Sequence, residues 1–275
     1  MIEMERPLTR AVIPAEAEGA PLSRRLVRRF RVSAVLLATV ALWAVAVRVF
    51  EVKRFILPSP ELVVARFFQN PGFVIQEFMV TTIEAAVGFA IAATLGVALA
   101  VLLARSALLE ELLFPYLNII RVTPSIAIAP LLVVWFGHTP TPHIIVATII
   151  SFFPIVVTTL LGLRSADPEL INLMRTLNAS PSAVFRKIRV PNSLPYLFAS
   201  FRISAPLAVI GTLVGEFAGG TGGMGNVLIV SRSNLDTPMS FLMIVLSGLL
   251  GIIFYGVVVV AERRLIRWHP SVQID

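Results

Sequence analysis

Few residues in this chain have types and spacings that could do chemistry. A literal GxGxxG pattern occupies Gly220–Gly225, and in dinucleotide-binding proteins such a pattern holds a pyrophosphate between a strand and a helix. Here an apolar run precedes the glycines and the next acid is Asp236, so the context for nucleotide binding is missing. The sequence contains no GxxxxGK[ST] segment, the usual loop for ATP phosphates. We interpret the glycines as a flexible loop that follows an apolar segment.

Catalytic and metal-binding groups have no candidate arrangement either. His138 and His143 flank Pro140 and Pro142 in a short predicted loop without a nearby carboxylate, so we expect solvated side chains rather than metal ligands. No nucleophile stands beside a base, which leaves hydrolysis without catalytic residues. The chain has no cysteine, which excludes disulfides and thiolate metal sites. The sequence thus predicts no catalytic site, no metal site and no bound cofactor.

Four ionisable residues lie inside apolar runs: Glu84, Arg121, Arg202 and Glu216. A charge is costly in hydrocarbon, so such residues usually face a cavity or a partner. The two arginines could instead extend toward the membrane surface, and Glu84 lies near the start of its run. Glu216 could pair with a neighbouring helix. We take all four as candidates for a substrate pathway.

The composition is that of an all-α membrane protein. The chain is 57% hydrophobic and 14% charged, with a mean hydropathy of +0.87. A membrane-spanning helix needs about 20 apolar residues, and residues 32–262 contain six such runs. The predicted spans are Val32–Val47, Val80–Ala104, Leu112–Phe136, His143–Leu163, Tyr196–Ala218 and Phe241–Ala261.

The distribution of basic residues predicts the orientation. With both termini in the cytoplasm, sixteen lysines and arginines lie inside and five lie outside, as the positive-inside rule requires. Residues 1–31 then form a basic, largely disordered cytoplasmic tail, and residues 263–275 form a second tail. The net charge of +7 fits anchoring on anionic lipid better than nucleic-acid binding, because the basic tail directly precedes an apolar run.

One polar, basic stretch, Leu163–Pro195, separates the fourth and fifth predicted spans. We call it the knob. Asp167 can cap a helix whose first residue is Pro168, and this helix is predicted to run to Leu177. Asn178 suits the residue after the helix, because asparagine tolerates a left-handed conformation.

The start signal then repeats within the knob. Ser180 and Pro181 predict a second short helix, which we expect Pro191 to end. Two short capped helices joined by a tight turn form a stiff body. A folded polar insert of this kind must meet something in water.

The knob resembles the cytoplasmic signature of permease subunits of ATP-binding-cassette (ABC) importers. That signature is Glu-Ala-Ala, three residues, Gly, nine residues, Ile, one residue, Leu-Pro. The spacing falls on Asn172–Met174, Asn178, Ile188 and Val190–Pro191, with the isoleucine and the proline kept. Asparagine in place of glycine is mild because both tolerate positive φ. Asn172 in place of glutamate removes a charge.

The resemblance covers about Phe55 to His269 and points to permeases of the nitrate, sulfonate and taurine group. The stretches that carry it are LPSP at Leu57, RVTPSIAIAPLLVVWFG at Arg121, FFPIVV at Phe152 and VGEFAGGTGGMG at Val214. It implies the six-helix type I importer fold, with residues 164–195 as a coupling-helix loop. The residues implied to couple to an ATPase are Glu169, Asn172, Met174, Arg175, Thr176, Leu177, Asn178, Ala179, Ser180, Pro181, Val184, Ile188 and Pro191.

The resemblance also implies the partners and the location. A second permease copy, forming a homodimer, would enclose the pathway in the cytoplasmic (inner) membrane. Two cytoplasmic ATPase subunits would hold ATP and Mg²⁺, and an external solute-binding protein would deliver the substrate. The chain itself would be a non-catalytic, multi-pass subunit.

The substrate is less well defined. Leu173–Arg175, Glu84 and the LDTP segment at Leu235 look more like permeases for thiamine-precursor pyrimidines or riboflavin than like sulfonate permeases. An acidic intramembrane set also suits a neutral heterocycle better than an anion. Sulfonate, taurine, nitrate and bicarbonate are the alternatives within the same class.

Two other classes compete with an importer. A gradient-driven secondary transporter or channel would need no ATPase, but such proteins often show inverted repeats, and none is convincing here. A non-transporting scaffold would explain the hydrophobicity, yet neither the knob nor the intramembrane glutamates. Co-purification of an ATPase separates these readings.

Overall fold

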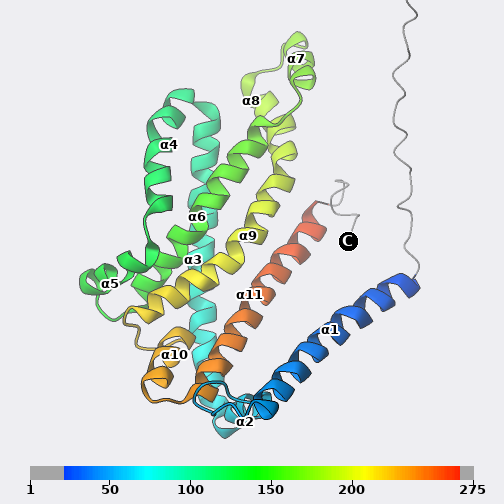
Figure 1. Ribbon diagram of the computed structural model, residues 1–275. Coiled ribbons are helices and arrows are strands. Elements are labelled where there is room, and N and C mark those ends of the chain that lie inside the picture. The colour runs from blue at the N-terminus through cyan, green and yellow to red at the C-terminus, as the bar shows by residue number, and fades with distance from the viewer. Residues whose placement is uncertain (1–21, 267–275) are drawn as a thin grey trace, which may run out of the picture.

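The computed structural model describes residues 22–266, with side chains from Ala34 onward, and every regular element in that range is helical (Figure 1). Of the two predicted tails, residues 1–21 and 267–275, with His269, lie outside the described residues, whereas residues 22–31 belong to α1 and residues 263–265 to α11. The elements are α1 (Leu22–Val49), α2 (Pro60–Gln69), α3 (Pro71–Arg105), α4 (Ala107–Val122), α5 (Ser125–Phe136), α6 (Pro140–Arg164), α7 (Pro168–Thr176), α8 (Pro181–Val184), the π-helical turn η1 (Phe185–Arg189), α9 (Val190–Phe217), α10 (Met224–Ser233) and α11 (Thr237–Leu265).

Prolines set many of the helix starts. α2, α3, α6, α7 and α8 each begin at a proline, where the missing N–H would have had no partner inside the helix. In three of them the preceding side chain caps the first turn: Asn70 accepts from the Phe73 amide, Asp167 from the Glu169 amide and Ser180 from the Ala183 amide. The starts predicted at Asp167 and Ser180 are therefore confirmed.

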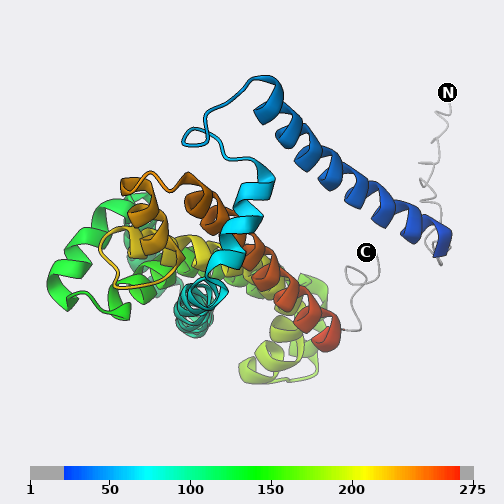
Figure 2. The same cartoon turned by 90° about the horizontal axis from the view of Figure 1, so that it is seen from below.

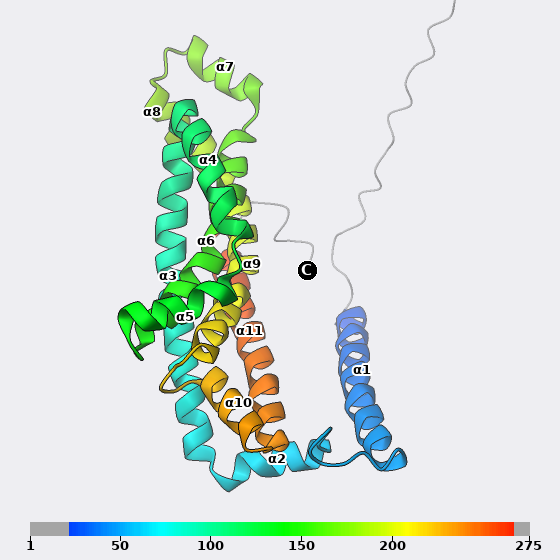
Figure 3. The same ribbon diagram turned by 60° about the vertical axis from the view of Figure 1, so that its left-hand side comes forward.

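Within residues 22–266, four helical segments are long and apolar enough to cross a membrane: α3, α6, α11 and the continuous run Pro181–Phe217. They extend along one direction, with α7 and α8 at one end and α2 and α10 at the other (Figures 1 and 3). α1 extends away from this bundle (Figure 2), and its apolar part, Ala34–Val49, is shorter. Near its C-terminal end Trp43 packs against Phe241 of α11, with ring centroids 6.0 Å apart.

The predicted third span, Leu112–Phe136, is not one helix. It is split into α4 and α5, which are bent by 92° at the break. Thr123 and Pro124 both have extended backbones there, because a proline ring disfavours helical geometry in the residue before it. α5 therefore projects sideways from the bundle (Figure 3).

The prediction that Pro191 ends the second knob helix is wrong. α8 continues through η1 into α9, so that one helical body runs from the knob into the bundle. In η1 the backbone widens, and the Val190 amide donates to the Phe185 carbonyl five residues earlier. A π-turn of this kind absorbs the steric conflict and the missing donor that a proline brings to a helix.

α6 lies at the centre of the bundle, packed against both α3 and α9. Ala147 of α6 is completely buried between Gly88 of α3 and Gly211 of α9. A Cβ atom at Gly88 would lie 2.6 Å from the Ala147 Cβ, and one at Gly211 would lie 2.6 Å from the Ala147 Cα. Small residues thus bring α9 onto α6 within one subunit.

We expect Gly211→Val to push α9 off α6, because even the Cβ atom of the new side chain would lie 2.6 Å from the Ala147 Cα and 3.0 Å from the Ala147 amide nitrogen. Overpacking of this kind costs about 1–3 kcal/mol. The measurement is thermal unfolding of the detergent-solubilised chain. Gly248→Val is the matched control, since a Cβ on this α11 glycine meets nothing within 4 Å. Equal melting temperatures for the two variants would contradict the packing described.

Candidate functional site

The turn between α7 and α8 has the geometry predicted for Asn178. This residue has φ +53°. The Asn178 amide donates to the Arg175 carbonyl and the Ala179 amide to the Met174 carbonyl, each with an N···O distance of 3.0 Å. This pair of bonds is the Schellman motif, which closes a helix through one left-handed residue. The turn is therefore a defined structure that satisfies the last carbonyls of α7.

Polar contacts fasten the base of the knob to the bundle. The Asn192 side-chain amide donates to the Gly162 carbonyl (3.2 Å) and to the Ser165 hydroxyl (2.9 Å). Arg164 at the end of α6 forms a two-pronged ion pair with Glu110 of α4, with one N···O distance of 2.7 Å. The knob is thus tied to α4, α6 and α9 together.

The structure separates the predicted coupling residues by exposure. Eight of them present exposed side chains or backbone at the surface of the knob: Glu169, Asn172, Arg175, Thr176, Leu177, Asn178, Ser180 and Pro181. Met174, Ala179, Ile188 and Pro191 are half-buried, and Val184 is buried. The exposed residues belong to α7 and to the turn, whereas those toward α9 pack inward.

The sequence analysis missed an apolar face on α7. Leu170, Leu173 and Leu177 recur at helical spacing and are 50%, 56% and 69% exposed. Leu170 and Leu173 on one face of α7, together with Leu177 directly after its last residue, form a surface that a partner would cover. The signal was present in the sequence as a period of three to four residues within the knob.

The prediction that His143 is a solvated loop residue is wrong, because His143 is a buried residue of α6. Pro140 begins α6 instead of continuing a loop, which places His143 in the first turn, 2% exposed. Its Nδ1 atom lies 2.9 Å from a carboxylate oxygen of Glu84 on α3. The carboxylate that seemed absent from the local sequence comes from another helix.

The glycine-rich loop is held by carboxylates of the same chain. Three successive amides donate to side chains of α3 and α9: Gly223 to Glu77 (2.5 Å), Met224 to Thr81 (2.8 Å) and Gly225 to Glu216 (2.6 Å). The Thr81 hydroxyl also donates to a carboxylate oxygen of Glu216, with an O···O distance of 2.7 Å. The amides that would hold a phosphate in a nucleotide site are thus occupied, and the loop is fixed rather than flexible.

These residues form one polar cluster, which we define as Glu77, Thr81, Glu84, His143 and Glu216. All five are buried. A Cβ atom at Gly215 would lie 2.6 Å from the His143 Cα, so the Glu84–His143 pair adjoins the residue before Glu216. The cluster lies at the end of the bundle opposite the knob, where α3, α6 and α9 meet the glycine loop.

The two intramembrane arginines lie elsewhere. The Nε atom of Arg202 on α9 donates to a carboxylate oxygen of Glu262 on α11, with an N···O distance of 2.6 Å, and the Glu262 side chain is 4% exposed. Arg121 lies in the last turn of α4 beside the bend. Its guanidinium lies 4.8 Å from the ring centroid of Phe153, and the residue is exposed. Among the four predicted pathway residues, the structure brings Glu84 and Glu216 together and leaves the arginines apart.

Comparison with known proteins identifies the class. Residues 92–267 match the family described as binding-protein-dependent transport system inner membrane component. The chain is 34% identical to the riboflavin transport system permease protein RibX of Chloroflexus aurantiacus, over 86% of this chain and 89% of RibX. It is 30% identical to the formylaminopyrimidine transport permease protein ThiX of Halalkalibacterium halodurans, over 86% and 94%. It is 29% identical to the putative aliphatic sulfonates transport permease protein SsuC of Escherichia coli, over 84% and 89%.

The fold is similar to that of a solved transporter. An inward-facing structure of the MetNI methionine ABC transporter superposes with a TM-score of 0.57 at 22% identity, over 71% of this chain and 95% of the other. This chain therefore belongs to the family of binding-protein-dependent inner-membrane transport components. It is a non-catalytic permease subunit of an ABC importer, and membership implies an ATPase and a solute-binding protein as partners.

The turn geometry yields a prediction at Asn178. Asn178→Gly should preserve transport, because glycine is comfortable at φ +53°. Asn178→Val should cost about 1–3 kcal/mol of local strain, tilt α7 relative to α8 and weaken ATPase binding. The measurement is transport and ATPase co-purification at matched expression. Identical behaviour of the two variants would show that the left-handed turn does not govern coupling.

Proposed function

We propose that two copies of this chain enclose the pathway of an importer and that an ATPase subunit docks on each knob. The observation that carries this proposal is the exposed leucine face of α7, formed by Leu170, Leu173 and Leu177. Apolar surface on a short polar helix favours a protein partner that receives the helix in a groove. The coupling residues inferred from the signature surround this face.

The connection from the knob to the bundle supports a mechanical role. Closure of the two ATPase subunits would move the paired knobs toward each other. The continuous body α8–η1–α9 would carry that displacement into α9, and the Asn192 and Arg164 contacts would carry it into α6 and α4. Rigid-body motion of these helices would then exchange access between the two sides of the membrane.

We further propose that the knob and both termini face the cytoplasm. In this arrangement the bent α4–α5 pair counts as a fifth span in addition to the four long helical segments, and α1 supplies the sixth. The excess of basic residues on the knob side supports this orientation. The glycine-loop end would then face outward and receive the solute-binding protein.

Single cysteines test the orientation, because the chain has none of its own. Ser182 in the knob and Thr221 in the glycine loop are both exposed. Ser182 belongs to α8 and Thr221 shortly precedes α10, and these two helices lie at opposite ends of the bundle (Figure 1). We expect Thr221→Cys to react with an impermeant thiol reagent in intact cells, and Ser182→Cys only after the membrane is opened. Labelling of both from one side would overturn the orientation.

For the substrate we propose a neutral heterocycle of the riboflavin or pyrimidine type. Support comes from the relatives that transport riboflavin and formylaminopyrimidine, with 34% and 30% identity. The pairing of Glu84 with His143 and of Glu216 with Thr81 makes both glutamates packing groups of the outer end. Arg121, exposed beside the α4–α5 bend, is the remaining candidate for the pathway wall.

Reconstitution tests this function. The chain is placed in proteoliposomes with its co-purifying ATPase and solute-binding protein, and uptake of labelled riboflavin and formylaminopyrimidine is followed. We expect uptake of one heterocycle that needs hydrolysable ATP and is unaffected by excess taurine. Competition by taurine would overturn the substrate class. Uptake driven by an ion gradient without ATP would overturn the importer itself.

A further inference from the structure

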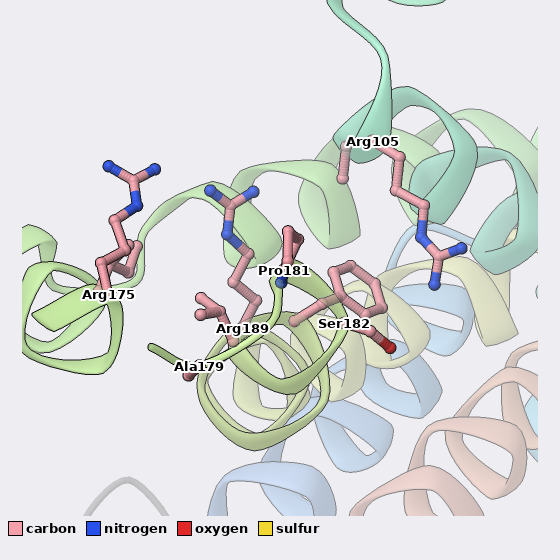
Figure 4. Close-up of a pocket in the computed structure, with 10 residues that line it drawn as sticks. Arg105, Arg175, Ala179, Pro181, Ser182 and Arg189 are labelled. Carbon is pink, nitrogen blue, oxygen red and sulfur yellow. The ribbon is translucent and has the colours of Figure 1, made fainter. Parts of the chain in front are cut away.

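A cleft of about 430 Å³ lies between the knob and the end of α3. It is separate from the leucine face, because the α7 residues that line it are Ile171 and Arg175, which point to another side of the helix. Three arginines line the cleft, Arg105, Arg175 and Arg189. Figure 4 shows the guanidinium groups of Arg175 and Arg189 extending in the same direction, with Arg105 beyond Pro181.

Among the described residues, the three positive charges have no counter-ion. Within the described residues, none of the three has a carboxylate oxygen within 4.0 Å. The Nε atom of Arg189 is buried and has no hydrogen-bond partner among the described residues. Buried N–H donors are nearly always satisfied, and like charges around one cavity repel each other. The cleft therefore has the character of an anion site.

One of the arginines is already oriented. The Arg105 guanidinium lies over the Phe185 ring of η1, 4.6 Å from its centroid. Stacking of this kind fixes the plane of the guanidinium while its N–H edge stays available for a carboxylate. Such preorganisation lowers the conformational cost of binding an anion.

A protein carboxylate suits the cleft better than a lipid phosphate. α7 carries the leucine face on one side and the cleft-lining residues on another, so a partner that receives α7 in a groove contacts both. The cleft also has apolar lining from Ile171, Ala179 and Val184, which suits the methylene stem of an acidic side chain. In addition, the position that carries glutamate in the family signature is Asn172 here, so the knob offers no acid of its own at that place.

We propose that the cleft receives an aspartate or glutamate side chain of the docked ATPase subunit, held by Arg175 and Arg189 with Arg105 behind them. This inference rests on the proposed docking of an ATPase at the knob. It deepens that proposal by naming the charge of the contact. The permease supplies the cations and the ATPase the anion.

Charge reversal is the first test. The full-length chain is purified in nanodiscs with its ATPase, and the affinity of the two is measured for Arg175→Glu and for Arg186→Glu. Arg186 is exposed on η1 and does not line the cleft, so it is the matched control. We expect Arg175→Glu to weaken ATPase binding by about tenfold or more, the scale of a lost close ion pair, and Arg186→Glu to change it by less than about twofold.

A zero-length cross-link is the second test and identifies the partner group. Arg175→Lys keeps the charge and adds an amine, which a carbodiimide can join to an adjacent carboxylate. The chain has one other knob lysine, the exposed Lys187, as the internal reference. We expect a new cross-linked peptide from position 175 to an acidic residue of the ATPase. Replacing that acid by lysine should restore binding to Arg175→Glu.

The outcomes separate this inference from the function on which it rests. If no ATPase binds the unaltered chain, the proposed function fails. If the ATPase binds the unaltered chain and Arg175→Glu equally and no cross-link forms at position 175, the cleft inference fails while the importer stands. Loss of ATPase binding in nanodiscs of phosphatidylcholine alone, restored by phosphatidylglycerol without a cross-link, would assign the cleft to a lipid phosphate and overturn the inference.

Discussion

The close approach of α6 to α3 and α9 is the constraint on which the rest of the structure depends. Ala147 fills the space between Gly88 and Gly211 so completely that no side chain could be added to either glycine without displacing a neighbour. A membrane offers no hydrophobic drive to hold helices together, so van der Waals contact at small residues has to supply the association. This contact fixes the distance and the rotation of three helices at once.

The polar cluster follows from that geometry. Only when α6 lies directly on α3 and α9 can His143 reach Glu84 and adjoin Gly215. Glu77, Thr81 and Glu216 then project toward the three amides of the glycine loop. Buried polar groups are expensive unless they are paired, and within the described residues these pairs leave only the His143 Nε2 atom of this cluster buried without a partner. The glycine loop and α10 are thereby fixed to the same three helices that carry the knob at the other end.

Signals that act within a few residues could be read from the sequence. The caps at Asp167 and Ser180 and the left-handed Asn178 each depend on the preferences of one or two side chains, and all three are present in the structure. The family signature also located the knob. These are local properties, and tertiary contacts reinforce them.

Features set by distant contacts or by competing effects could not be read in the same way. Prolines at 130, 154 and 206 remain inside helices, whereas Pro124 breaks one, and no local pattern distinguishes them. Pro191 is accommodated by a π-turn that no sequence pattern predicts. The partner of His143 is 59 residues away, which no spacing rule connects. The partners of Glu84 and Glu216 could therefore not be predicted from the sequence around each residue.

The central claim is that the knob and α9 move as one body, and a distance measurement across η1 tests it most directly. Spin labels on Ser182→Cys and Ile210→Cys, both exposed positions, are about 40 Å apart along a helix of 1.5 Å rise per residue. Dilution of the labelled copies with unlabelled, cysteine-free copies isolates the distance within one subunit. The account predicts one narrow distance that is the same in the nucleotide-free and the ATP-bound transporter. A distance that changes between the two states would show that η1 is a hinge and would contradict rigid transmission from the knob.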